Sequence, residues 1–549
     1  MISLKHISAL LACFMLFPTG HAVQIRRQPG QGIPEYTLPT DRDNPALWTS
    51  KPNSFFTRSA NPGAYAVTDV PRMGTIEYPL VLVDFEDLHF SIQDNRKLLE
   101  RYELMFNAHG YSDSSTFTVH ETEYHGATGS VSDYFRDQSY GQFIPKFKII
   151  GPVRVSKGYA YYGKGKADNV DALVREVCDS IITNNLINLS GYARNGTVDQ
   201  LSIIYAGRGE NYNGSDINTI WPQASIVSFT PKDSAVYRSG IKDVKYACTC
   251  ELFWDTDTIL DGIGTFCHEF SHTLGLPDFY NTDSQSESEV NAAMGYWSIM
   301  DYGNYEDGGF SPVGYTAFEK YSLGWMDLEE IKYAGTYSLS DISRTSDPEN
   351  DIHTAYRLNT GNDDQFIIFE NHIKTGWYKY HASEGLMVTA VDYDEDSWAK
   401  SNKVNTSQKR YQILAADNNY ARTTNSQDLF PLGDTDSITT LGTPKLKAGS
   451  SYPQYSIYRI RKNAGKISFC AAPDMASKVQ HTTKEEISIN LTDGELSVSA
   501  PIGSNVSVHE LSGKTVLQTV TTQPAQRIAL PDHGIWIVKC GDTVRKIAQ

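Results

Sequence analysis

The sequence predicts a multidomain α/β protein in which a mixed layer of strands and helices is followed by a β-rich region and a small all-β unit. Three observations lead to this expectation. The chain has 549 residues, which is too long for one hydrophobic core. Between residues 76 and 335, continuous apolar runs alternate with segments of helical spacing, as in an α/β layer. After about residue 332, apolar and polar residues alternate, as in half-buried strands.

The first 75 residues differ from the rest. Residues 1–22 have the pattern of a secretory signal peptide, because Lys5 gives a positive start, a short apolar run follows, and Ala22 is suited to cleavage. The run is too short to span a bilayer. A buried N-terminal helix and lipoprotein processing at Cys13 are the alternatives. Residues 23–75 are rich in Pro, Gly, Arg and Asn without apolar periodicity, which indicates a pro-segment or a linker.

The segment from residue 76 to 335 carries the elements of the mixed layer and is expected to form one domain. Mostly apolar runs predict buried strands at residues 78–85 and 201–205. Apolar residues at helical spacing predict helices over residues 94–106, 131–135, 168–182 and 262–274. Gly275, directly after the last of these, is a suitable residue to end a helix.

Two β units are expected after this domain. Residues 336–474 form a predicted β-rich domain packed on the preceding one, with the clearest alternation at residues 365–370. Residues 475–549 form a predicted C-terminal β-sandwich, in which a strand and turn at 506–516 are repeated in plan at 534–542. The sequence shows no tandem repeat, and no later segment is long and apolar enough for a membrane helix.

Composition narrows the classes of function. The formal net charge of −17 argues against a nucleic-acid partner, because phosphate binding needs a basic surface. The seven cysteines are sparse and irregularly spaced, which is not the pattern of a disulfide scaffold, although pairing of some of them stays open. Cys248 and Cys250 are too close in sequence for a structural zinc pair, so we expect buried thiols on a strand.

The segment His268-Glu269-Phe270-Ser271-His272 carries the predicted chemistry. A helix places residues i and i+4 on one face, so His268 and His272 can hold one zinc ion (Zn²⁺) through their imidazoles. Glu269 reaches the same cleft without being a ligand. It can take a proton from water at the metal and pass it to a leaving amine. Two histidines without a metal on an ordinary helix are the alternative.

A third ligand is expected where the chain turns back after the helix, at Gly275. Asp278 can then swing towards the metal and leave a fourth position for water. A downstream glutamate, Glu287 or Glu289, is the alternative ligand. Every residue from 281 to 289 is polar or charged, so a solvated loop is the better interpretation of these two.

The segment Trp297-Ser298-Ile299-Met300-Asp301-Tyr302 resembles the methionine turn of the metzincin metallopeptidases. The zinc motif also matches the aspartate form of their long motif, His-Glu-x-x-His-x-x-Gly-x-x-Asp. The resemblance implies a metzincin-like zinc peptidase domain with a mixed sheet and an active-site helix. It further implies that Met300 packs beneath the zinc and that Tyr302 is a catalytic residue, which hydrogen-bonds the water at the metal or the developing oxyanion.

More of the chain resembles the immune-inhibitor-A family of secreted metallopeptidases. The resemblance covers roughly residues 76–435, and its strongest stretches are residues 129–135, 139–143, 151–153, 204–207, 220–222, 268–280 and 384–394. It implies a secreted zinc-dependent endopeptidase acting on protein or peptide substrates, and we expect a monomer. Phe279 is a departure, because the family often has an acidic residue directly after the Pro-Asp pair.

The end of the chain resembles the C-terminal sorting domain of the type IX secretion system. Residues 534–542, followed by a turn and by residues 544–547, carry most of this resemblance. It implies the type IX machinery as a partner and export through the periplasm, so that the protein is secreted or attached to the outer surface. An ordinary β-sandwich with a packing role is the alternative.

Two other functions and one further metal site are compatible with parts of the sequence. A surface adhesin on a peptidase-like scaffold is disfavoured by the intact Glu269, and a cysteine hydrolase using Cys267 is disfavoured because its neighbour His268 faces elsewhere on a helix. One acidic cluster offers oxygen ligands for Ca²⁺: Asp392, Asp394, Glu395 and Asp396. The cluster lacks the glycine-hinged loop of a calcium site, so a solvated turn is the favoured interpretation.

Overall fold

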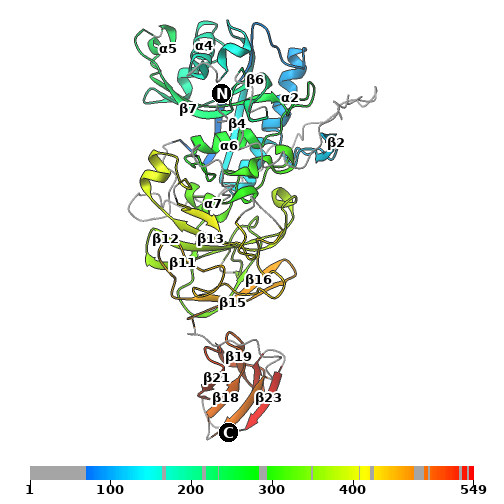
Figure 1. Ribbon diagram of the computed structural model, residues 1–549, viewed down its shortest axis with the longest axis vertical. Helices are drawn as coiled ribbons and strands as arrows, with labels where there is room; N and C mark the ends of the chain where they lie inside the picture. Colours follow the sequence, from blue (N-terminus) through cyan, green and yellow to red (C-terminus); the bar gives the residue numbers. More distant parts are fainter. Residues whose placement is uncertain are drawn as a thin grey trace, which may run out of the picture. The chain divides into compact units, whose positions relative to one another are not determined.

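The structure is a computed structural model (Figure 1). It describes residues 70–163, 169–212, 218–232, 234–282, 293–347, 350–406, 408–420, 426–474, 487–492, 495–530, 534–540 and 543–548. The predicted signal peptide and most of the predicted pro-segment lie outside the described residues. The chain divides into two compact units, each treated by itself below. Among the described residues, the first unit holds those up to Asp327 and those within Thr375–His381 and Glu395–Ser407, and the second unit holds the others.

A mostly parallel sheet forms the centre of the first unit, with the strand order β4-β1-β6-β8-β7. Its members are β1 (Gly74–Asp84), β4 (Phe143–Arg154), β6 (Thr197–Arg208), β7 (Gln223–Ser228) and β8 (Asp243–Leu252). The first four strands of this order run parallel, whereas β7 pairs with β8 in the antiparallel sense. The predicted strands at 78–85 and 201–205 fall within or at the end of β1 and β6, whose apolar runs are buried on both faces.

Helices cover this sheet. The four that the apolar spacing predicts are all present, with ends shifted by a few residues, whereas the two short helices at 234–238 and 317–323 were not predicted. The helices are α2 (Asn95–Asn107), α3 (Val131–Gln138), α4 (Asn169–Thr183), α5 (Ser234–Arg238), α6 (Gly264–Thr273) and α7 (Ala317–Leu323). Local caps fix several starts: the Asp94 carboxylate accepts from the first turn of α2, and α3 and α7 each begin with a capping box.

Short elements complete the first unit. They are the hairpin β2 (Thr116–Val119) and β3 (Thr122–His125), the small strand β5 (Ala193–Arg194), and the 3₁₀ or π turns η2 (Tyr159–Tyr162), η3 (Leu189–Tyr192), η4 (Glu210–Tyr212), η6 (Gly295–Trp297), η7 (Tyr302–Gly309), η9 (Gly376–Tyr378) and η10 (Asp396–Lys400). The predicted division of the chain would leave η9 and η10 in the β-rich domain, whereas in the structure both lie in the first unit.

The second unit is built from sheets that are antiparallel except for one pair, in which β9 runs parallel to β11. A five-stranded sheet has the order β14-β13-β12-β11-β9, and a three-stranded sheet has the order β10-β16-β15. Their bounds are β9 (Glu329–Glu330), β10 (Gly335–Leu339), β11 (Ala355–Asn362), β12 (Gln365–His372), β13 (Gly385–Asp392), β14 (Tyr411–Ile413), β15 (Ser456–Asn463) and β16 (Lys466–Ala472). The two sheets share one apolar core, which includes Phe369, Val388 and Phe469.

The last seven strands form two further sheets, in the orders β17-β18-β21 and β20-β19-β22-β23. Their bounds are β17 (Ser488–Thr492), β18 (Glu495–Ser499), β19 (Asn505–Glu510), β20 (Thr515–Val520), β21 (Ala525–Ile528), β22 (Ile535–Cys540) and β23 (Thr543–Ala548). Alternate residues of both sheets, among them Val498, Val508 and Val538, are buried in a common core.

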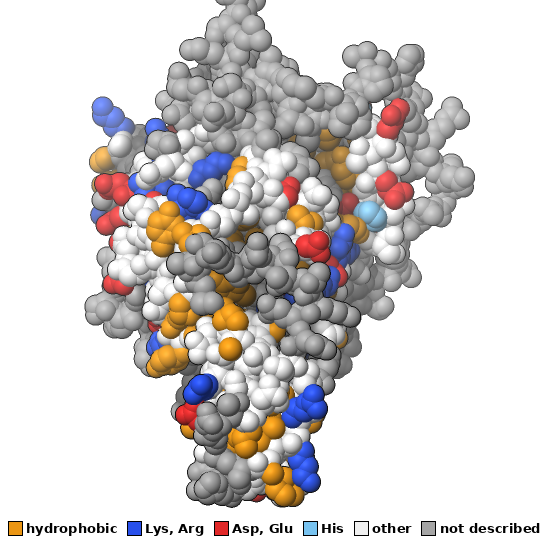
Figure 2. Space-filling model, turned by 60° about the horizontal axis from the view of Figure 1, so that its bottom comes forward, with side chains coloured by type: hydrophobic (Ala, Val, Ile, Leu, Met, Phe, Trp, Pro, Cys, Tyr) orange, Lys and Arg blue, Asp and Glu red, His pale blue; other side chains and the backbone are white. Residues whose placement is uncertain are grey.

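Three properties of the described residues bear on the predictions from composition. Cys248 and Cys250 are buried on β8, as expected, and the six cysteines described are all free thiols. No helix in the described ranges is long and apolar enough to cross a membrane. On the face seen in Figure 2, basic and acidic side chains of the described residues stand in small separate groups rather than in one continuous basic area.

Candidate metal centre

Helix α6 presents the predicted metal ligands, and aromatic packing holds it against the sheet. The Phe270 ring contacts Tyr78 at 5.3 Å between centroids, and both Phe266 and Phe270 contact Phe147, at 5.6 and 5.7 Å. These aromatic residues occupy the face of the helix that is turned to the sheet. His268 and His272 lie on another face of the same helix, so packing of the apolar face fixes the direction in which the imidazoles point.

Two glycines are required where α6 begins and ends. A Cβ on Gly264 would lie 1.9 Å from the backbone oxygen of Asn304, so only glycine lets the start of the helix approach η7 this closely. Gly275 has a φ of +103°, which a residue with a side chain rarely adopts. The chain therefore reverses after α6, as the sequence predicts, and carries Asp278 back towards the histidines.

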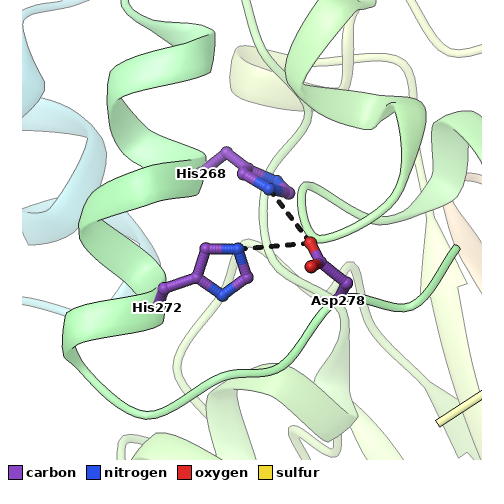
Figure 3. A group of neighbouring side chains, drawn as sticks. All are labelled: His268, His272 and Asp278. Carbon is purple, nitrogen blue, oxygen red and sulfur yellow. Dashed lines mark ion pairs between the residues drawn. The ribbon is translucent and has the colours of Figure 1, made fainter. Parts of the chain in front are cut away.

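Three side chains converge beside α6 (Figure 3). The Oδ1 atom of Asp278 lies 3.2 Å from Nε2 of His268 and 3.2 Å from Nε2 of His272. The two imidazole rings are 4.8 Å apart and nearly perpendicular. Among the described residues, these three form the one group of His, Cys, Asp or Glu side chains whose ligand atoms gather closely enough to hold a metal ion.

The second polar atom of each of the three side chains is held by a neighbour. Nδ1 of His268 lies 2.7 Å from the carbonyl oxygen of Ile299, and Nδ1 of His272 lies 2.8 Å from that of Leu276. A ring nitrogen beside a carbonyl must carry a proton, so Nε2 is the atom of each ring that can bind a metal. Oδ2 of Asp278 accepts a 2.6 Å hydrogen bond from the amide of Asn402.

The group fits a zinc ion by the chemistry of its donor atoms and by the position of Asp278 Oδ1 between the two imidazoles. Asp278 is only 5% exposed, and among the described residues its buried Oδ1 faces no polar donor other than the two histidine Nε2 atoms at 3.2 Å. Burial disfavours charge on both imidazoles, but the carboxylate outweighs it and raises the pKa of His268 and, to about 9, that of His272. Burial likewise opposes a charged Asp278, yet the two histidines hold its pKa well below the usual range. Two imidazoles and one carboxylate are a known donor set of catalytic zinc, with a fourth position left to water.

Glu269 lies next to the group without entering it. Its side chain is buried at 6% exposure, and burial raises its pKa above the ordinary value, against the lowering effect of His268 and His272. Its carboxylate also accepts a hydrogen bond from the backbone N–H of Ala224 on β7. A buried carboxylate with a raised pKa beside a metal site has the properties of a general base.

The turn from Trp297 to Tyr302 supports the group from a second direction. Its Ile299 carbonyl contacts His268, and its Met300 carbonyl accepts a 2.7 Å hydrogen bond from the N–H of Phe279, the residue after Asp278. Met300 itself is fully buried. The turn is closed by the Asp301 carboxylate, whose Oδ2 accepts from the N–H groups of Met294 and Gly295. Burial raises the pKa of Asp301 to about 7.

Tyr302, the predicted catalytic tyrosine, is half-buried at the start of η7, and its ring lies 6.1 Å from that of Tyr296.

Two tyrosines that the sequence analysis does not single out lie near the carboxylates of Asp278 and Glu269. Tyr280 hydrogen-bonds Asp278, and burial raises its pKa, as does the charge of Glu269. Burial also raises the pKa of Tyr305, again with a contribution from Glu269. Tyr280 follows the zinc motif by two residues, which is the one sequence signal that could have drawn attention to it.

Cys267 and Asp392, two further predicted candidates, are not among the three converging side chains. Glu287 and Glu289 are outside the described residues. Burial raises the pKa of the Cys267 thiol well above its ordinary value, which does not favour a nucleophilic thiolate. In the predicted acidic cluster, the Asp392 carboxylate accepts hydrogen bonds from Gln365 and Arg410, so protein donors already occupy its oxygens.

Residues 75–329 match the family model described as the catalytic domain of immune inhibitor A peptidase M6. This stretch is therefore a peptidase M6 family domain, and the resemblance predicted from the sequence is confirmed for it. The matched residues include α6, Asp278 and the turn from Trp297 to Tyr302.

Two curated relatives are similar to part of this chain. The pre-pro-metalloprotease PrtV of Vibrio cholerae serotype O1 is 27% identical over 298 residues, which cover 48% of this chain and 32% of that protein. Immune inhibitor A of Bacillus thuringiensis subsp. alesti is 31% identical over 237 residues, which cover 37% of this chain and 34% of that protein. The chain thus spans about a third of the length of these relatives.

Proposed function

We propose that this peptidase M6 domain makes the protein a zinc-dependent endopeptidase that hydrolyses peptide bonds of extracellular proteins. The observation that carries the proposal is the convergence of Nε2 of His268, Nε2 of His272 and Oδ1 of Asp278 beside the buried carboxylate of Glu269. The relatives named above support it, since one is a metalloprotease by name. The buried Oδ1, which in the described residues faces only the Nε2 atoms of the two histidines, supports the choice of a cation as the shared partner of the three atoms.

The three converging side chains would hold the zinc ion. When bound, zinc polarises a peptide carbonyl and lowers the pKa of a water molecule to about 7. The carbonyls of Ile299 and Leu276 hold the Nδ1 protons of His268 and His272, so each ring can bind the ion through Nε2, after losing any proton there, without rotating. Because Asp278 carries a negative charge, the ligand set leaves part of the ionic charge uncompensated and available to polarise a substrate.

Glu269 is the proposed general base and acid. Its burial favours the neutral form, so that it accepts a proton from the attacking water readily and returns it to the leaving amine. The Ala224 N–H that holds its carboxylate belongs to β7, the last strand in the order of the sheet. A substrate strand lying along this cleft edge would have its scissile bond beside Glu269. Tyr302 is proposed to stabilise the tetrahedral intermediate, as the resemblance to the metzincins implies.

Export is part of the proposal. The signal-like residues 1–22 and the resemblance of residues 475–549 to a sorting domain support passage through the periplasm and the type IX machinery, to the outside or the outer surface. The net charge of −17 suits a soluble protein in that environment. Zinc is the metal we assign, with no role assigned to calcium.

A chelator experiment tests the proposed activity. The purified protein should degrade an unstructured substrate such as casein, lose this activity with a zinc-selective chelator, and regain it when zinc is returned. An adhesin would show no turnover under either condition. A cysteine hydrolase would keep its activity in the chelator and lose it with a thiol-alkylating reagent, so the three outcomes are distinct.

A further inference from the structure

We propose that Asn402 is a positioning residue of the metal centre, which fixes the carboxylate of Asp278 so that one oxygen faces the two histidines. The inference rests on the proposed metal site. It extends that site to a residue 124 positions further along the chain and outside the stretch that matches the peptidase family model.

The contact between Asn402 and Asp278 is double. The Asn402 side-chain oxygen accepts a 2.7 Å hydrogen bond from the backbone N–H of Asp278, and its Nδ2 donates a 2.6 Å hydrogen bond to Oδ2 of the same residue. Because a backbone N–H can only donate, the orientation of the amide is settled: its oxygen faces that N–H and its nitrogen faces the carboxylate. Both hydrogen bonds therefore act together to fix one rotamer of Asp278.

This contact decides which carboxylate oxygen is offered to a metal. With Oδ2 bonded to Asn402, the other oxygen, Oδ1, is left at 3.2 Å from both histidine Nε2 atoms. The corresponding contacts on His268 and His272 come from backbone carbonyls, which no substitution of a side chain removes. Among the outer contacts of the ligands, Asn402 is a side chain that bonds both the backbone and the carboxylate of Asp278, and mutagenesis can test this contact.

The segment that carries Asn402 is fastened to the same stretch of chain at further points. Nδ2 of Asn405, which is 3% exposed, donates to the carbonyl of Phe279, and the Thr282 hydroxyl donates to the carbonyl of Asn402, both at 2.8 Å. On its other side, the N–H of Phe279 donates a hydrogen bond to the carbonyl oxygen of Met300. Residues 278–279 therefore run between the Trp297–Tyr302 turn and the segment from Asn402 to Asn405.

An aromatic anchor holds this segment in place. The Trp398 side chain on η10 is 4% exposed and lies 6.3 Å, edge to face, from Phe318 of α7. Phe318 in turn lies 6.2 Å from Phe279. Asn402 has a φ of +52°, a left-handed conformation that asparagine tolerates better than most residues. The packing of Trp398 and the left-handed turn at Asn402 hold the amide of this exposed residue against the buried carboxylate of Asp278.

The test replaces Asn402 in the full-length protein and measures zinc binding directly. Asn402→Gly removes the amide while allowing the positive φ, so that backbone strain is not added. The matched control is Asn195→Gly, since Asn195 is an exposed asparagine with a φ of +53° in the same unit, far in sequence from the site. The dissociation constant for zinc is obtained by competition with a chelator of known affinity.

We expect Asn402→Gly to raise the zinc dissociation constant about 10- to 100-fold, the usual cost of losing an outer contact of a ligand, with Asn195→Gly unchanged. Proteolysis should fall at low free zinc and recover at higher free zinc set by a chelator buffer, which a purely structural defect would not do. If the Gly variant does not fold, Asn402→Asp carries the same test, because aspartate tolerates this φ and keeps an acceptor for the Asp278 N–H but has no donor for Oδ2. Unchanged zinc affinity in a folded variant overturns the inference.

The same measurements separate this inference from the proposed function. Wild-type protein that binds no zinc, or that binds it equally well after His268→Ala, would contradict the metal site itself. Wild-type protein that loses zinc on His268→Ala but not on Asn402→Gly would leave the metal site intact and reject only the role of Asn402.

Discussion

The Oδ1 atom of Asp278 lies 3.2 Å from Nε2 of His268, although ten positions separate the two residues in the chain. The same oxygen is equally close to Nε2 of His272. The proximity follows from the end of α6 at Gly275, where the positive φ turns the chain back onto the helix face that it has just left. Three donor atoms around one small space are the structural basis of the proposed zinc centre.

Glu269→Gln should abolish proteolysis while leaving zinc bound. The amide keeps the size of the side chain but cannot accept the proton, and a positioned base contributes about 10²- to 10⁴-fold to the rate. Casein hydrolysis and zinc content by elemental analysis check the two halves of this expectation. Glu103→Gln, on the exposed side of α2, is the control and should behave as wild type. Substantial activity in Glu269→Gln would reject the proposed base.

Asp278→Ala should weaken zinc binding by at least about tenfold, because one of three protein ligands is lost. Competition with a fluorescent chelator measures the affinity. Asp257→Ala is the matched control, since its side chain is 87% exposed. If zinc content and affinity are the same in Asp278→Ala and the control, the third ligand lies elsewhere in the chain.

Asp261→Asn should stabilise the protein increasingly as the pH rises. Burial raises the pKa of Asp261 from 3.8 to about 7, against hydrogen bonds from Tyr212, Gly262 and Cys250. The folded state therefore holds a proton that the unfolded state releases, so the stabilising contribution is complete below pH 3.8 and is lost as the pH rises to about 7. An asparagine has the same shape and carries no charge at any of these pH values.

The readout is the difference in melting temperature between Asp261→Asn and wild type, measured from about pH 5 to about pH 8 at constant zinc. Other titrating groups cancel in this difference. It should grow in favour of the variant over that range. A difference that is constant or that shrinks with rising pH would mean that Asp261 is ionised in the folded protein at both ends.

Removing residues from 475 onward should stop export past the outer membrane without destroying the peptidase domain. The two last sheets have a hydrophobic core of their own, and the metal centre lies wholly within the first unit. The truncated protein should accumulate in the periplasm, where fractionation with an antibody to the peptidase domain would detect it. Normal amounts outside the cell would show that these strands do not direct sorting.

Local patterns in the sequence predicted much of the peptidase domain. The apolar run in β1 and the spacing in α2 and α4 were sufficient to place these elements to within a few residues, because burial on one or both faces dictates such patterns. The grouping of His268, His272 and Asp278 was predictable for a similar reason. All three residues lie within eleven positions, and helix geometry and one glycine determine their relative placement.

Contacts between distant parts of the chain could not be predicted in this way. Asn402 lies in a polar stretch without apolar periodicity, and nothing local indicates that it reaches Asp278. Thr375–His381 and Glu395–Ser407 join the first unit for the same kind of reason, since a few buried side chains such as Trp398 decide where they pack. Tyr280 and Tyr305 near Glu269 were missed because a tyrosine in a turn carries no periodic signal.

The most direct test of the zinc centre is a crystal structure of the zinc-loaded protein with anomalous data collected at the zinc absorption edge. The proposal predicts a single strong anomalous peak beside α6, about 2.0–2.2 Å from Nε2 of His268, Nε2 of His272 and Oδ1 of Asp278. A peak elsewhere in the molecule, or the absence of a peak at these three atoms in fully loaded protein, would contradict the account.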